Sequence, residues 1–231
     1  MAGHRPKQVL YAHFADVAKA LGHAHRLEIL ELLAQSERSV EALAERAELS
    51  IANASQHLRL MRRAGLLTSR RDGQRILYRL SDPAVLTLVA ALHRVGERNL
   101  AEVREVVDGY FHDRDALESV SHQELARRLK DGMVTVLDVR PEDEFAAGHL
   151  PNAINIPLRE LARQLSGLPK GQEVVAYCRG RYCVLAFEAV ALLRQHGFKV
   201  RRMEDGYPEW KAAGFPVAFD NRAVQASGDR P

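Results

Sequence analysis

Cysteine is scarce in this sequence: the 231 residues contain two, Cys178 and Cys183. A small secreted domain held together by disulfides needs several pairs, so a disulfide framework is excluded. A zinc site is disfavoured as well, because the spacing is C-x4-C rather than C-x2-C and no second cysteine pair completes it. We therefore expect unpaired thiols in the reducing environment of the cytoplasm.

Long apolar runs are also missing. No stretch of eighteen apolar residues occurs, and the first residues contain no apolar segment of the signal-peptide type. We expect neither a membrane span nor secretion. The hydrophobic fraction of 46% is nonetheless ample for packed cores, and the length suits one or two domains.

The net charge is small, at +3, but positive charge is unevenly distributed. The stretch His57–Arg79 contains seven arginines and a single acidic residue, Asp72. A local basic patch on a nearly neutral chain is expected where a protein contacts the phosphate backbone of nucleic acid.

Four helices are predicted before residue 65. Apolar residues at helical spacing in 7–21 and 25–34 indicate two core helices. Ser39 is the N-cap of a short third helix, and Ser50 is the N-cap of a fourth, which ends at Gly65. A short helix, a tight turn and a second helix form the helix-turn-helix pattern, whose second helix enters the major groove of DNA.

The second helix of this motif, which follows Ser50, is predicted to bury Ile51, Leu58 and Met61. Its opposite face carries the polar side chains that we expect to contact DNA: Asn53, Ser55, Gln56, His57 and Arg59.

A β-hairpin is predicted directly after it. The segments 66–71 and 74–80 flank Asp72-Gly73, a strong signal for a two-residue turn. Ile76, Tyr78 and Leu80 fall on one face. The hairpin also carries four arginines, Arg70, Arg71, Arg75 and Arg79, which suits a basic wing on DNA. Any one of these arginines, taken alone, is equally well explained as a solvated surface charge.

The segment Ser50–Leu67 resembles the recognition helix of the arsenical-resistance-repressor (ArsR) family of winged-helix regulators, and the resemblance extends over about residues 10–110. The family implies a homodimer that binds palindromic double-stranded operator DNA and releases it when an effector binds. Asp82-Pro83 starts a helix predicted to continue through Val107, long enough to pair with its two-fold mate.

Founding members of this family bind metal through thiolates on the first helix of the helix-turn-helix. The matching stretch, Val40–Arg46, contains neither cysteine nor histidine, so that metal site is absent. His93 and Glu97 share a helix face, but further ligands are missing, and we interpret the pair as solvated. The scattered histidines His4, His13, His23 and His25 are interpreted in the same way. No metal is predicted.

The remainder of the chain alternates strands with helices. Four strands are predicted, at 133–140, 154–157, 174–177 and 199–203, and Ser121 begins a helix with a capping box. This alternation indicates a parallel α/β sheet, in which ligands bind at the carboxyl ends of the strands. We predict a DNA-binding and dimerisation domain at 1–111, a linker at 112–120, an α/β domain at 121–219 and a disordered tail at 220–231.

Both cysteines lie in the loop Tyr177–Cys183, between a predicted strand and a predicted helix over 184–194. Free backbone N–H groups and the positive end of the helix dipole converge there on an anion, which favours a thiolate. Arg179 and Arg181 add positive charge. We interpret Cys178 as a nucleophile or sulfur carrier; the alternative is that both cysteines are small core residues.

Residues 118–219 resemble the rhodanese family. The matching motifs are Leu137–Arg140, Gly148–Pro157, the loop Cys178–Cys183 and Asp205–Trp210. By this resemblance, Cys178 accepts a sulfane sulfur as a persulfide, and Arg179 and Arg181 hold the sulfur or a donor such as thiosulfate or a low-molecular-weight persulfide. Asp138 and Arg140 are implied to be structural or rim groups. Cys183 departs from the family, where threonine or serine is common, and raises disulfide or polysulfide chemistry with Cys178.

The predicted fold is therefore a winged helix-turn-helix domain followed by an α/β rhodanese-like domain with a parallel sheet, with no cofactor. The preferred function is a transcriptional repressor that senses or handles sulfane sulfur at Cys178. One alternative is an active sulfurtransferase with an autoregulatory DNA-binding domain. Another is an arsenite or redox sensor that uses Cys178 and Cys183.

Overall fold

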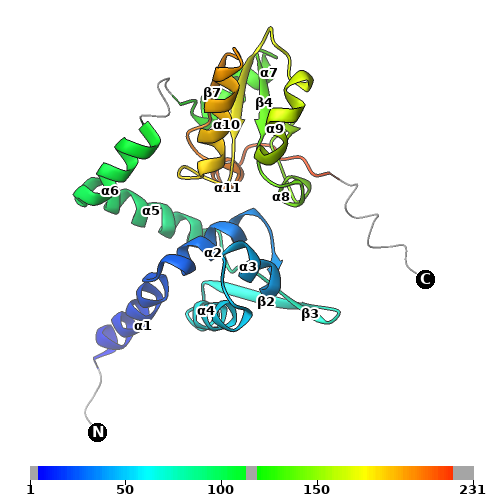
Figure 1. The fold of residues 1–231 in the computed structure, drawn as a ribbon. Coiled ribbons are helices and arrows are strands. Elements are labelled where there is room, and N and C mark those ends of the chain that lie inside the picture. Colours follow the sequence, from blue (N-terminus) through cyan, green and yellow to red (C-terminus); the bar gives the residue numbers. More distant parts are fainter. Residues whose placement is uncertain (1–4, 113–118, 221–231) are drawn as a thin grey trace. The chain divides into compact units, whose positions relative to one another are not determined.

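The computed structural model describes residues 5–112 and 119–220, in two compact units that divide between His93 and Arg94 (Figure 1). Most of the predicted linker and tail, residues 113–118 and 221–231, lies outside the described residues. The predicted boundary at residue 111 places the end of the first domain later than this division does.

The N-terminal unit combines helices with a small antiparallel sheet of order β1-β3-β2. Its elements are α1 (Pro6–Leu21), α2 (Ala24–Gln35), β1 (Arg38–Ser39), α3 (Val40–Arg46), α4 (Ile51–Arg63), β2 (Leu67–Asp72), β3 (Arg75–Leu80) and most of α5 (Ala84–Asn99). The two serine caps are confirmed. The Ser39 hydroxyl accepts a hydrogen bond from the Ala42 amide at 3.3 Å, and the Ser50 hydroxyl accepts one from the Asn53 amide at 3.2 Å.

Two predictions about burial in this unit are wrong. Ile51, predicted to be buried, is 54% exposed, because it is the first residue of α4 and Ala54, one turn later, takes the core position beside Leu58 and Met61. Helix α1, predicted to be a core helix, buries only its last two residues; Leu10, Tyr11 and Phe14 are exposed. The apolar side of α1 is therefore not covered by residues 5–112 and 119–220, which the structure describes.

The wing is present, but its turn is shifted by one residue. Asp72 pairs with Arg75 across the hairpin, so the two turn residues are Gly73 and Gln74 rather than Asp72 and Gly73. Gly73 has a φ of +58°, and glycine at the first turn position suits a type II′ turn. Of the residues predicted to share one face, Tyr78 is buried, whereas Ile76 is exposed near the tip.

The predicted long last helix is broken. Helix α5 ends at Asn99, and Leu100 is extended before α6 (Ala101–Val106) and a π-helical segment, Val107–His112. The Asn99 side-chain amide donates to the Val95 carbonyl at 2.9 Å. Asparagine side chains that bond to nearby backbone compete with continued helix, which accounts for the break.

The C-terminal unit contains a four-stranded sheet of order β5-β4-β6-β7 in which every pairing is parallel, as predicted. From residue 119 its elements are α7 (His122–Lys130), β4 (Val134–Asp138), α8 (Glu142–Ala146), β5 (Ile154–Asn155), α9 (Leu158–Gln164), a 3-10 turn (Leu165–Gly167), β6 (Glu173–Tyr177), α10 (Val184–Gln195), β7 (Val200–Arg202) and α11 (Tyr207–Ala212).

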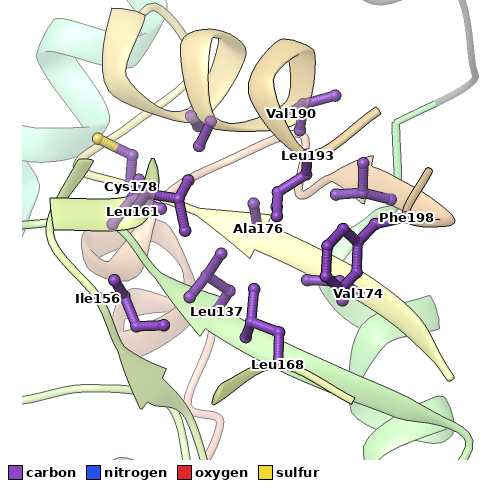
Figure 2. Close-up of a cluster of buried hydrophobic side chains, with 14 of the residues drawn as sticks. Leu137, Ile156, Leu161, Leu168, Val174, Ala176, Cys178, Val190, Leu193 and Phe198 are labelled. Atoms are coloured by element: carbon purple, nitrogen blue, oxygen red, sulfur yellow. The ribbon is translucent and has the colours of Figure 1, made fainter. Parts of the chain in front are cut away.

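The period of two along the strands divides this unit into two cores. On one face, Val174, Ala176 and Cys178 pack with residues of α9 and α10 (Figure 2). On the other face, Val175 and Tyr177 pack with α7 and with Tyr207 and Trp210 of α11. Cys178 therefore continues the alternation of β6 toward α10.

None of the helices described in residues 5–112 and 119–220 is both long and apolar enough to cross a membrane.

Candidate functional site

The predicted DNA-reading residues lie on α4 of the N-terminal unit. Asn53, Gln56 and Arg59 are exposed, whereas Ser55 and His57 are half-buried. The Arg59 guanidinium donates to the Ser55 carbonyl at 3.2 Å, one turn back on its own helix. Three side chains of the predicted set are therefore accessible for base contacts, and two are partly covered.

His57 lies against two histidines that were interpreted as solvated. Its ring centroid is 4.6 Å from that of His23 and 6.2 Å from that of His25. Burial, and then the neighbouring His23, Arg26 and His25, lower the pKa of His57. Among the described residues no group of three or more His, Cys, Asp or Glu side chains has an arrangement that suits a metal ion.

The wing arginines differ from one another in their partners. Arg70 forms an ion pair with Glu37, its Nε lying 3.0 Å from the carboxylate, and lies 3.5 Å from Asp72. Arg71 donates to the Gly73 carbonyl at 3.0 Å and so braces the turn. Arg75 is exposed on β3. Part of the positive charge of Arg70 is therefore neutralised within the chain.

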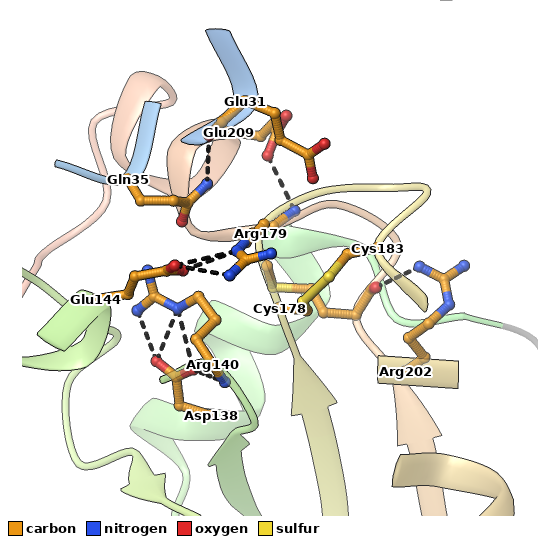
Figure 3. Close-up of a disulfide and its surroundings, with 12 residues drawn as sticks. Glu31, Gln35, Asp138, Arg140, Glu144, Cys178, Arg179, Cys183, Arg202 and Glu209 are labelled. Carbon is orange, nitrogen blue, oxygen red and sulfur yellow. Dashed lines mark hydrogen bonds and ion pairs between the residues drawn. A yellow bond between two sulfur atoms is a disulfide. The ribbon is translucent and has the colours of Figure 1, made fainter. Parts of the chain in front are cut away.

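The loop Cys178–Cys183, here called the cysteine loop, lies at the carboxyl end of β6 and directly before α10, as predicted. The structure joins Cys178 and Cys183 in a disulfide (Figure 3), so the prediction of unpaired thiols is wrong. The two Cα atoms are 6.2 Å apart, within the range of about 4.4–6.8 Å that a disulfide requires. Both residues are buried, with 1% of Cys178 and 6% of Cys183 exposed.

The backbone of the loop is held from two sides. The Cys183 amide donates to the Gly180 carbonyl at 3.1 Å, and the Tyr207 amide donates to the Cys178 carbonyl at 3.1 Å. A Cβ atom at Gly206 would collide with the backbone of Arg179 and Gly180, so glycine is required there. The motif Asp205–Trp210 thus packs against the backbone of the cysteine loop and holds it in place.

Each loop arginine has a carboxylate partner that the sequence did not reveal. Arg179 binds Glu144 through two nitrogens, with Nη2 2.8 Å from Oε1, and Glu144 is fully buried (Figure 3). Arg181 lies 2.6 Å from Glu204. The sequence does place acidic residues next to two of the matched motifs, and these could have indicated the partners. They are Glu142–Glu144 after Arg140 and Glu204 before Asp205.

The C-terminal unit begins at Arg94 and so includes the last turn of α5. In that turn, Glu97 accepts a hydrogen bond from the Tyr182 hydroxyl and lies 3.8 Å from Arg181. Burial and then this carboxylate raise the pKa of Tyr182. Glu97, interpreted as solvated from the sequence, therefore contacts two residues of the cysteine loop.

Asp138 and Arg140 form a fully buried ion pair at the end of β4, with Arg140 Nη2 2.6 Å from Asp138 Oδ2. Arg140 also donates to the Gly148 carbonyl at 2.8 Å and stacks on Tyr207, and the Tyr177 hydroxyl donates to Asp138. Burial opposes the charge of Arg140, but Asp138 outweighs it and raises the pKa of Arg140. Of the two implied roles, structural or rim, burial supports the structural one.

Family models match both units of the chain. A helix-turn-helix model matches residues 21–70, and a rhodanese-like domain model matches residues 121–213. The fold and these matches define a protein with an N-terminal winged helix-turn-helix domain and a C-terminal rhodanese-like domain.

A full-length relative makes the assignment more specific. The chain is 42% identical over 230 residues to the HTH-type transcriptional regulator Rv0324 of Mycobacterium tuberculosis, which covers 99% of this chain and 100% of that protein. The chain therefore belongs to the family of this two-domain transcriptional regulator.

Other relatives match one half each. A sulfurtransferase of Allochromatium vinosum is 30% identical over 103 residues, which are 44% of this chain and 94% of that protein. A solved homodimeric winged helix-turn-helix DNA-binding domain from Mycobacterium bovis is 39% identical, covers 44% of this chain and 95% of that chain, and has a TM-score of 0.40. A rhodanese-related protein from Thermoplasma volcanium is 30% identical, covers 44% of this chain and 98% of that chain, and has a TM-score of 0.41.

Replacement of Arg140 by leucine leaves the Asp138 carboxylate buried without its cationic partner. We expect this variant to lower the free energy of unfolding by about 3–5 kcal/mol. Urea unfolding followed by the fluorescence of Trp210, the single tryptophan and buried in this unit, measures the decrease.

The matched control is Arg159→Leu, because Arg159 forms an exposed ion pair with Glu142 at 3.0 Å. Its expected cost is much smaller, because water screens an exposed ion pair. Similar decreases for the two variants would contradict a special role for the buried pair.

Proposed function

We propose that this transcriptional regulator is a cytoplasmic repressor whose rhodanese-like domain accepts sulfane sulfur at Cys178 and thereby weakens operator binding. An effector shifts a regulator between two states only if it has different affinities for them, so a site for the effector is needed. Among the described residues, the cysteine loop is the best-supported site.

The observation that carries the proposal is the position of the cysteine loop. It joins a parallel strand to the N-terminus of α10, where backbone amides favour bound anions and thiolates. Its residues Arg181 and Tyr182 contact Glu97 in the last turn of α5. A change of charge or volume at Cys178 thus alters a segment that contacts the last turn of α5.

The test compares operator binding by reduced protein, by protein treated with thiosulfate or glutathione persulfide, and by a treated Cys178→Ala variant. The probe is a duplex selected from random DNA by the reduced protein, and fluorescence anisotropy gives the Kd. We expect roughly 5- to 150-fold weaker binding after treatment, reversed by a reductant and absent in the variant. Equal affinity of reduced and treated protein would overturn the sensor function.

A coupling variant sharpens this test. Glu97→Gln removes the charge that faces Arg181 while it keeps a hydrogen-bond acceptor for Tyr182. It should bind the operator and accept sulfur normally but respond less to the donor. If its response matches that of the natural protein, the α5 contact does not carry the coupling.

For the DNA interface we propose base contacts from Asn53, Gln56 and Arg59 and backbone contacts from the wing. Because Arg70 is paired with Glu37, Arg71 and Arg75 are the sharper test. The double variant Arg71→Ala with Arg75→Ala should weaken binding to all duplexes. Its log–log salt slope should fall by roughly one unit for each phosphate that the wing no longer neutralises.

The control for this double variant is Arg127→Ala with Lys130→Ala, which removes the same charge from exposed positions on α7. This control should leave the salt slope unchanged. The same slope in both double variants would remove the wing arginines from the interface.

We also propose that the regulator is a homodimer. Two helices carry exposed apolar side chains at helical spacing: Leu10 and Phe14 on α1, and Leu88, Leu92 and Val95 on α5. Such surfaces are typical of faces covered by a second subunit. Replacing Leu10 and Phe14 by aspartate should give a monomer by light scattering, with operator affinity abolished. Met133→Asp, at an exposed apolar residue outside both helices, should stay dimeric, and a dimer in the double aspartate variant would exclude α1 from the interface.

The second candidate is a working sulfurtransferase whose DNA-binding half controls its own operon. The similarity to the Allochromatium vinosum sulfurtransferase favours it. Sustained turnover of thiosulfate that operator DNA does not affect, together with unchanged operator affinity, is the expected result for this alternative. Tight arsenite binding that Cys183→Ser abolishes would instead favour the thiol-pair sensor.

A further inference from the structure

Any sulfur chemistry at Cys178 takes place within reach of a second thiol. The two sulfur atoms are close enough to bond to each other, and the hydrogen bond from the Cys183 amide to the Gly180 carbonyl closes the loop between them. Both cysteines are buried in the core between β6 and α10. Cys183 is already in contact with Cys178, so its thiol reaches a persulfide there without diffusing in from solution.

Cys183 is also the residue directly before α10, a helix of twelve residues. The positive end of the helix dipole favours an anion at this position, and a thiolate is the reactive form of cysteine. The loop therefore places a second nucleophile beside Cys178.

We propose that Cys183 is a resolving cysteine that converts a persulfide on Cys178 into the Cys178–Cys183 disulfide and releases hydrosulfide. This inference rests on the proposed function, which supplies the persulfide. It makes the disulfide, rather than the persulfide, the lasting product of sulfur sensing.

The chemistry needs no oxidant beyond the sulfur donor. In the first step, the Cys178 thiolate attacks the sulfane sulfur of thiosulfate and forms an S–S bond, while the S–S bond of thiosulfate breaks and sulfite leaves with its electron pair. In the second step, the Cys183 thiolate attacks Sγ of Cys178, the bond between Sγ and the sulfane sulfur breaks, and hydrosulfide leaves with the electron pair of that bond. The two thiols are oxidised to a disulfide, and the sulfane sulfur is reduced to sulfide.

The position of attack decides the outcome. Attack by Cys183 on the outer sulfur would only move the persulfide from one cysteine to the other. Attack on Sγ of Cys178 forms the bond that the structure contains. Return to the dithiol state then takes two equivalents of a low-molecular-weight thiol, which end as its disulfide.

The experiment starts from full-length protein reduced under anaerobic conditions and freed of reductant. Thiosulfate or glutathione persulfide is added to the natural protein and to the Cys183→Ser and Cys178→Ser variants, and a sample without donor controls for oxidation. Intact mass spectrometry gives the state of the cysteines, and alkylation with monobromobimane traps the hydrosulfide.

We expect the natural protein to lose the mass of two hydrogen atoms and to release one equivalent of hydrosulfide per chain. Cys183→Ser should instead gain the mass of one sulfur atom at Cys178 and release none, and Cys178→Ser should show no disulfide. If the natural protein also keeps the added sulfur, the resolving role is overturned while sulfur acceptance stands. If Cys183→Ser gains no sulfur from either donor, sulfur acceptance at Cys178 fails and the resolving role fails with it.

Discussion

The buried pair of Asp138 and Arg140 is the interaction on which the cysteine loop depends. Asp138 ends β4 and accepts the hydroxyl of Tyr177, the residue directly before Cys178. Arg140 holds the Gly148 carbonyl and stacks on Tyr207, whose amide binds the Cys178 carbonyl. Two charges without access to water stabilise a fold only when their remaining donors and acceptors are satisfied, and here the loop supports supply several of those partners. The residues that contact the ion pair therefore also hold the cysteine loop in place.

Electrostatics at the loop are more balanced than two arginines in six residues suggest. Glu144 neutralises Arg179, and Glu204 and Glu97 face Arg181. The arginines connect the loop to α8, to the segment before Gly206 and to the last turn of α5. Their charges are therefore largely balanced by carboxylates within the C-terminal unit.

Helix α5 lies at the division between the two units. Because the helix ends at Asn99, its last turn packs with the cysteine loop in the C-terminal unit, while the residues before Arg94 belong to the N-terminal unit. The contacts of Glu97 with Arg181 and Tyr182 therefore lie within the C-terminal unit.

The sequence by itself determined the features that depend on neighbours along the chain. Ser39 and Ser50 predict helix starts because their hydroxyls bond to amides three residues later, and the continuous apolar run Val174 to Tyr177 predicts a strand buried on both faces. The family motifs placed Cys178 at the carboxyl end of that strand. Only the tertiary structure decided the partners of charges and apolar faces. Glu144 and Arg179 are 35 residues apart, Glu97 and Tyr182 are 85 apart, and the exposure of Ile51 and α1 depends on what the rest of the fold covers. Local hydrogen bonds and periodicity are encoded within a few residues, whereas an ion pair, a disulfide or a covered surface depends on which distant segments meet.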